Sequence, residues 1–294
     1  MHLEIQLSPE SATLLALTRS RHAVAHDASL AVSSPLKPLH SRPNPLSLSH
    51  PPVGTERSVA AKPSGLDWRR SLWQRMSYRP LLKTVGISLF ISIFFIGYFH
   101  LLRYPAFTPF AMPLTALDLA IPFQPSAIVA YLSLWVYVGV APGLQDNLRA
   151  LVVYGLWAAL LCGVGLASFY FLPTTVPPRW WGDVDPQRHP AFALLQGIDA
   201  AGNACPSMHV ATAVFTAVRL HHLLRQLATP AALRVASLGW CALIVYSTLA
   251  IKQHVVLDVL VGALLGLTVA LVSLRSWRAQ PRTLPRDPGP SAPL

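Results

Sequence analysis

Charged residues are scarce in this chain of 294 residues, and acidic residues are the scarcest of them. Asp and Glu number 12 against 23 Lys and Arg, and charged residues make up 12% of the chain while 53% are hydrophobic. A soluble domain of this size needs more polar surface than that composition supplies. The sequence therefore indicates a membrane protein.

Cysteine is rarer still. The three cysteines, at positions 162, 205 and 241, are an odd number and do not have the spacing of metal ligands. This excludes a disulfide scaffold and a zinc ribbon.

The two ends of the chain lack apolar runs long enough to cross a membrane. Residues 1–75 are rich in Pro and Ser, so they cannot bury enough apolar surface to offset the entropy of ordering. We expect a disordered cytoplasmic extension over residues 1–75, a membrane domain over 76–278 and a disordered cytoplasmic tail over 279–294. Met76, directly before the first apolar span, is an alternative start of the protein.

Apolar runs of spanning length follow this extension, each near the ~20 residues that cross a hydrocarbon core. They predict an all-α integral membrane protein with a bundle of six transmembrane helices. Arg219 interrupts the fourth run and would have to snorkel or face the bundle. The six predicted spans are Leu81–Leu102, Ser126–Ala141, Arg149–Leu172, Ser207–Leu227, Leu233–Ile251 and Val255–Leu274.

The basic residues predict the orientation of these spans. With both termini in the cytoplasm, 19 of the 23 Lys and Arg residues lie on the cytoplasmic side, as the positive-inside rule requires. The positive charge is thus a matter of topology, and nucleic acid is not an expected partner. The loops 103–125 and 173–206 and the turn around Lys252 then face the extracytoplasmic side, periplasmic or lumenal.

One carboxylate, Asp258, lies within an apolar span, four residues after His254. A carboxylate within the membrane costs free energy to bury, so by default it indicates a functional site. Positions i and i+4 share a helix face, so Asp258 can orient one imidazole nitrogen and leave the other as a base or nucleophile. A purely structural His–Asp pair is the alternative.

A second polar group, Cys205-Pro206-Ser207-Met208-His209, stands where the loop 173–206 enters the fourth span. Pro at a helix start followed by Ser and His presents backbone N–H groups, the positive end of the helix dipole and two polar side chains. Because this site and the turn before His254 emerge on the same membrane face, the two imidazoles are expected to converge.

These residues resemble the motifs of the type 2 phosphatidic acid phosphatase superfamily, whose members are typically six-helix membrane enzymes. Pro206-Ser207-Met208-His209 matches its Pro-Ser-x-His motif, and Ser247, His254 and Asp258 match its Ser-x6-His-x3-Asp motif. The surrounding residues are most similar to the branch that includes inositol phosphorylceramide synthases.

Two features depart from the superfamily pattern. Its Lys-x6-Arg-Pro motif is not met around Arg179, and Thr248 stands where Arg usually follows the motif Ser. Lys252 is the best candidate for the missing phosphate clamp, and Arg179 is the second; each is otherwise a plain interfacial charge.

The resemblance implies an enzyme that hydrolyses or transfers phosphoryl groups of lipid phosphate esters or pyrophosphates in the bilayer. His254 would be the nucleophile, Asp258 would fix its tautomer, and His209 would act as acid and then base. Ser207, Ser247, Thr248, Lys252 and Arg179 are the expected substrate-binding residues. No metal or other cofactor is needed. Transfer to an inositol, sugar or lipid hydroxyl is the alternative reaction, and a proton-coupled transporter is the alternative class.

Overall fold

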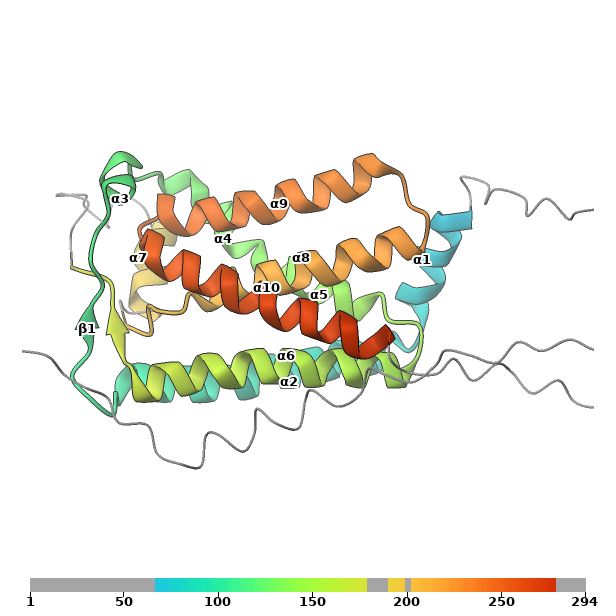
Figure 1. The fold of residues 1–294 in the computed structure, drawn as a ribbon, viewed down its shortest axis with the longest axis horizontal. Helices are drawn as coiled ribbons and strands as arrows, with labels where there is room; N and C mark the ends of the chain where they lie inside the picture. The colour runs from blue at the N-terminus through green and yellow to red at the C-terminus, as the bar shows by residue number, and fades with distance from the viewer. Residues whose placement is uncertain (1–66, 179–189, 199–201, 279–294) are drawn as a thin grey trace, which may run out of the picture. The chain divides into compact units, whose positions relative to one another are not determined.

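The computed structural model describes residues 67–178, 190–198 and 202–278, and these residues are mostly helical (Figure 1). Within them, five helical segments are long and apolar enough to cross a membrane. This supports a multi-pass membrane protein.

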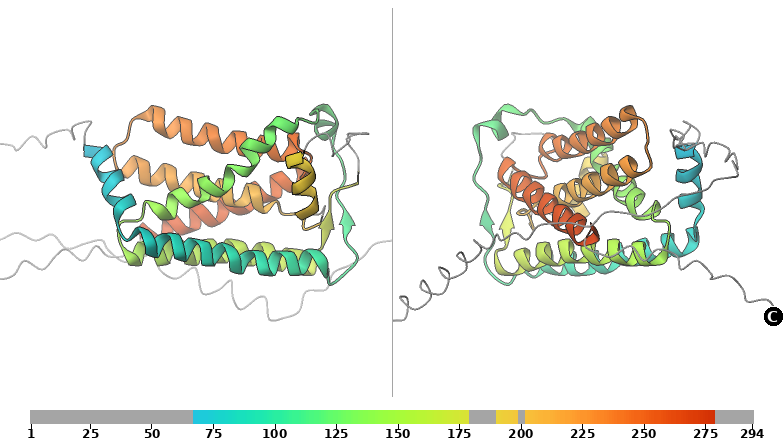
Figure 2. Two further views of the ribbon diagram at one scale, coloured as in Figure 1. Left: turned by 180° about the vertical axis from the view of Figure 1, so that it is seen from behind. Right: turned by 45° about the vertical axis from the view of Figure 1, so that its right-hand side comes forward.

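Each predicted span corresponds to a helix or helical segment, with ends that differ by a few residues. The bounds are α2 Pro80–Arg103, the segment Pro125–Gly143, α6 Leu148–Phe171, α8 Met208–Gln226, α9 Ala231–Ala250 and α10 Val256–Arg278. Figure 2 shows α2 and α6 side by side, and the two helices are in contact.

The second span is divided into a 3-10 turn, Pro125–Ala127, and the helices α4, Ile128–Leu132, and α5, Leu134–Gly143. Ser133 lies at the junction of α4 and α5. Its hydroxyl donates to the Ala130 carbonyl at 2.6 Å and accepts from the Trp240 indole N–H of α9 at 3.1 Å. This contact ties the junction to α9.

The fourth predicted span, α8, is not among the five apolar segments, because Arg219, His221, His222 and Arg225 lower its hydropathy. It nevertheless packs against α5, α6, α9 and α10. Arg219 faces the bundle, with its guanidinium 5.7 Å from the centre of the Tyr154 ring and 3.4 Å from the Ser273 hydroxyl. A helix surrounded by other helices does not need a lipid-facing surface, so it tolerates these polar residues.

A helix, α1, covers Asp67–Ser77, which includes the last residues of the range predicted to be a disordered extension. Arg75 of this helix forms an ion pair with Asp146 at 2.9 Å. The buried Lys83 ammonium donates to the carbonyls of Arg75, Gly143 and Gln145 at 2.6 to 2.8 Å. These contacts fasten α1 to the ends of α2 and α5.

Short elements connect the helices at the opposite end of the bundle (Figure 1). They are β1 Phe110–Ala111, α3 Ala116–Ala120, β2 Thr174–Thr175 and α7 Pro190–Ile198. The strands pair in parallel, with Phe110 opposite Thr174. This pairing joins the two long loops that were predicted to share one membrane face.

Two glycines four residues apart let α10 cross α8 at close range. A Cβ on Gly262 would collide with the main chain of Ser207, and one on Gly266 with the main chain of Ala211. Such small-xxx-small spacing allows two backbones to approach closely. In a membrane this close packing stabilises helix association, because the hydrophobic effect does not drive helices together there.

We therefore expect Gly266→Ala to lower the free energy of unfolding by about 1–3 kcal/mol, because the added methyl group meets backbone and forces the helices apart. The midpoint of thermal unfolding in detergent is the measurement. Gly163→Ala on α6 is the matched control, since a Cβ there meets no atom within 4 Å. Equal midpoints for the two variants would contradict the close crossing.

Candidate active site

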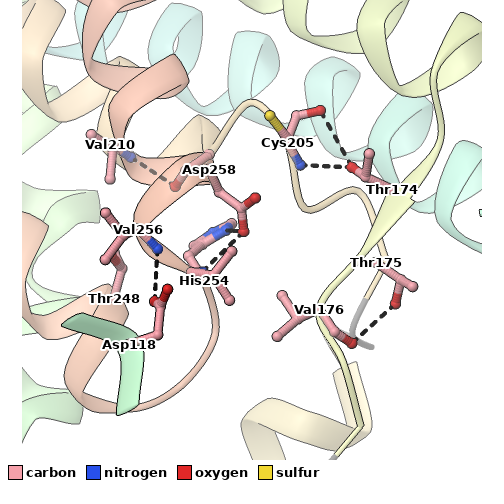
Figure 3. Close-up of polar contacts among 12 residues, drawn as sticks. Asp118, Thr174, Thr175, Val176, Cys205, Val210, Thr248, His254, Val256 and Asp258 are labelled. Atoms are coloured by element: carbon pink, nitrogen blue, oxygen red, sulfur yellow. Dashed lines mark hydrogen bonds and ion pairs between the residues drawn. The ribbon is translucent and has the colours of Figure 1, made fainter. Parts of the chain in front are cut away.

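His254, in the turn before α10, lies beside Asp258 in the first turn of that helix, as Figure 3 shows. The Nδ1 atom of His254 is 3.6 Å from Oδ2 of Asp258, and the carboxylate is fully buried. Nδ1 is thus the imidazole nitrogen that faces the carboxylate, and Nε2 is the one that does not.

The Asp258 carboxylate is only partly satisfied by hydrogen bonds. Its Oδ2 accepts from the Val255 N–H at 3.0 Å. Among the described residues, Asp258 Oδ1 and His254 Nδ1 have no hydrogen-bond partner. The 3.6 Å separation is slightly longer than a hydrogen bond. Because the excess is small, a small rotation of the imidazole would bring Nδ1 and the carboxylate into hydrogen-bond distance.

His209 occupies the first turn of α8 and is held by two aromatic residues of the second span. Its ring stacks on Tyr131 with centroids 3.8 Å apart and planes 10° apart, and the Trp135 ring meets it edge-on at 5.7 Å. The His209 Nε2 atom lies 3.4 Å from the Tyr131 carbonyl. No motif in the sequence pointed to Tyr131 or Trp135.

Both imidazoles line one cavity of about 360 Å³. His209 reaches it from α8, and His254 from the turn before α10. The structure thus brings together the two histidines that the sequence placed 45 positions apart.

Ser207 is the N-cap of α8. Its hydroxyl accepts from the Val210 N–H at 3.3 Å, and its own N–H donates to the Asp258 carbonyl at 3.1 Å. Two residues earlier, the Cys205 N–H donates to the Thr174 hydroxyl at 2.8 Å (Figure 3). The start of α8 is therefore tied both to α10 and to the loop 173–206.

The hydroxyls of Ser247 and Thr248 make hydrogen bonds within α9. They donate to the carbonyls of Ile244 and Val245, at 2.6 and 2.8 Å, and both residues are buried. The Thr248 carbonyl accepts from the N–H groups of Gln253 and His254. In this structure both side chains belong to the framework of the turn that carries His254.

Lys252 is buried and has a positive φ of 61°. Its ammonium donates to the carbonyls of Asp118 and Ile121, at 3.1 and 2.5 Å. Burial lowers the pKa of Lys252 from its usual value, while the charge of Asp118 acts in the opposite direction. These two carbonyls engage at least two of the three N–H donors of the ammonium. Arg179, the second candidate clamp, lies outside the described residues.

Asp118 of α3 contacts the start of α10, and no sequence motif pointed to it. It is buried, and its Oδ1 accepts from the Val256 N–H at the start of α10 at 2.8 Å (Figure 3). Its Oδ2 accepts from the N–H and hydroxyl of Thr115 at 2.8 and 2.7 Å. The pattern Thr115-x-x-Asp118 forms a capping box, and this local signal could have identified it.

Comparison with known proteins supports the superfamily resemblance. The model of a family described as the PAP2 superfamily matches residues 148–282, a range that contains both motifs, and this supports membership of that superfamily. No curated protein and no solved structure gave a significant match. The likeness to inositol phosphorylceramide synthases stays a prediction.

Asp118→Ala should lower the free energy of unfolding by about 1–3 kcal/mol, because the Val256 N–H is left without its acceptor. Asp146→Ala is the control, since it removes a carboxylate from an exposed ion pair worth about 0–1 kcal/mol. Chemical denaturation in detergent measures both. A cost for Asp118→Ala no larger than that for Asp146→Ala would contradict the anchoring role.

Proposed function

We propose that this protein is a membrane enzyme that removes or transfers phosphoryl groups of lipid phosphate esters or pyrophosphates, with His254 as nucleophile. Its superfamily suggests a lipid phosphate phosphatase type of activity. The observation that carries the proposal is the convergence of His209 and His254 on one cavity, with Asp258 behind His254.

In the first step, Nε2 of His254 attacks phosphorus and the bond between phosphorus and the leaving oxygen breaks. Asp258 holds the proton on Nδ1 and stabilises the positive charge that develops on the imidazole. His209 donates its proton to the leaving oxygen.

In the second step, His209 takes a proton from water as the water oxygen attacks phosphorus. The N–P bond breaks, phosphate leaves, and His254 returns to its starting form. An acceptor alcohol in place of water would give phosphotransfer, which is the reaction implied by the likeness to inositol phosphorylceramide synthases.

The start of α8 is the best-placed group to stabilise the phosphoryl oxygens. The first N–H groups of a helix have no intrahelical carbonyl to bind, and the helix dipole favours an anion there. We assign Lys252 a supporting role, since its ammonium is engaged with Asp118 and Ile121. No cluster of three or more His, Cys, Asp or Glu residues suited to a metal ion occurs in the described part of the chain.

We also propose that α8 crosses the membrane together with the five apolar segments. Its neighbours α9 and α10 both meet the spanning criteria, and α8 packs against each of them. Six crossings put both termini on one side, and the excess of Lys and Arg there assigns that side to the cytoplasm. The active site then faces the extracytoplasmic side.

His254→Ala, His209→Ala and Asp258→Asn should each lower turnover of a lipid phosphate at least ~100-fold, because nucleophilic and acid–base steps are lost. His221→Ala is the control, since His221 lies on α8 more than three turns beyond His209. Phosphate release measures activity, and trapping of a labelled phosphohistidine identifies the nucleophile.

Activity should survive excess chelator. Full activity in His254→Ala protein, or loss of activity in chelator that divalent ions restore, would overturn the mechanism.

Labelling of single cysteines tests the topology. In a variant without native cysteines, an impermeant reagent added from outside should label Phe107→Cys, in the loop 103–125, and not Gln226→Cys, at the far end of α8. The structure describes both positions. The reverse pattern would contradict the proposed orientation.

A further inference from the structure

The cavity that reaches His209 and His254 is much longer than a phosphate group requires. Its wall on α2 runs from Leu82 to Tyr98, which at ~1.5 Å per residue is about 24 Å. The hydrocarbon core of a bilayer is ~30 Å thick. The cavity thus follows most of the length of a membrane-spanning helix.

The wall of this cavity is apolar over nearly its whole length. Representative side chains are Phe90 and Phe94 from α2, Leu134 and Val138 from α5, and Leu151 and Leu161 from α6. Apolar cavities of this kind stay dry and bind apolar molecules. Water is therefore a poor occupant of the space between these helices.

Polar groups mark the two ends. At one end are the two imidazoles and Asn203, whose side-chain amide donates to the Tyr98 carbonyl at 2.9 Å. At the other end is Lys83, whose ammonium is held by three carbonyls. A molecule that fills the cavity needs a polar group at the histidine end and a hydrocarbon chain along the rest.

We propose that this cavity holds one hydrocarbon chain of the substrate, with its phosphate at His209 and His254 and its chain running along α2 toward Lys83. The inference rests on the proposed function and adds where the substrate's apolar part binds. Because the chain contributes its own binding free energy, substrates with longer chains are bound more tightly until the cavity is filled.

Two glycines of α6 provide a matched test. Gly155 lines the cavity, and Gly163, on the same helix, does not. A Cβ on either residue would meet no atom within 4 Å. Gly155→Leu should therefore fill part of the cavity without displacing the protein, and Gly163→Leu makes the same chemical change outside it.

The experiment measures binding of water-soluble alkyl phosphonates with two to ten carbons to the protein in nanodiscs, by calorimetry. These compounds cannot be hydrolysed at the P–C bond, so binding is read independently of turnover. Burial of one methylene is worth up to about a fourfold gain in affinity. Wild-type protein and Gly163→Leu should show affinity rising with chain length, whereas Gly155→Leu should bind ethylphosphonate normally and show a much weaker rise.

An equal rise in Gly155→Leu and wild type would overturn the inference, and so would an equal loss of affinity for every chain length. Hydrolysis of the corresponding alkyl phosphates separates the two proposals. If affinity rises with chain length and Gly155→Leu abolishes the rise, but no phosphate is cleaved, then the cavity is a chain site and the proposed enzymatic function is wrong.

Discussion

The close crossing of α8 and α10 is the contact on which the candidate site depends. Gly262 and Gly266 let the two backbones meet, and the Ser207 N–H donates to the Asp258 carbonyl within this contact. Pro-Ser-x-His and His-x3-Asp are therefore two sides of one helix–helix interface. Their geometry is determined by backbone packing, which is stiffer than contact between flexible side chains.

The buried carboxylate of Asp258 lies in the first turn of α10, where the helix dipole favours an anion. Asp258 accepts the Val255 N–H, and Asp118 accepts the next N–H, that of Val256, so two carboxylates meet the positive end of α10. Helix dipoles favour anions at this end, which offsets part of the desolvation penalty. The loop that carries Asp118 is thus part of the support of the site, although it lies more than 130 residues earlier in the chain.

Much of this arrangement could be predicted from local spacing. Apolar length located the helices, and the four-residue interval placed His254 and Asp258 on one face. The contacts of Tyr131 with His209 could not be predicted, because they arise from packing between spans that no periodicity reports. The small residues Gly262 and Gly266 did carry a readable signal for close approach. The carbonyls that accept from the Lys252 ammonium could not be predicted, because nearness to His254 in sequence says nothing of the residues that surround a side chain.

Arg219 has a consequence for motion. It fixes the far part of α8 against Tyr154 and Ser273, while Ser207 fixes its beginning against Asp258. A slide of α8 by one turn, ~5.4 Å, would break both attachments at once. α8 is therefore held along the bundle at both ends, whereas α2 has only Lys83 and Tyr98 buried among its 24 residues.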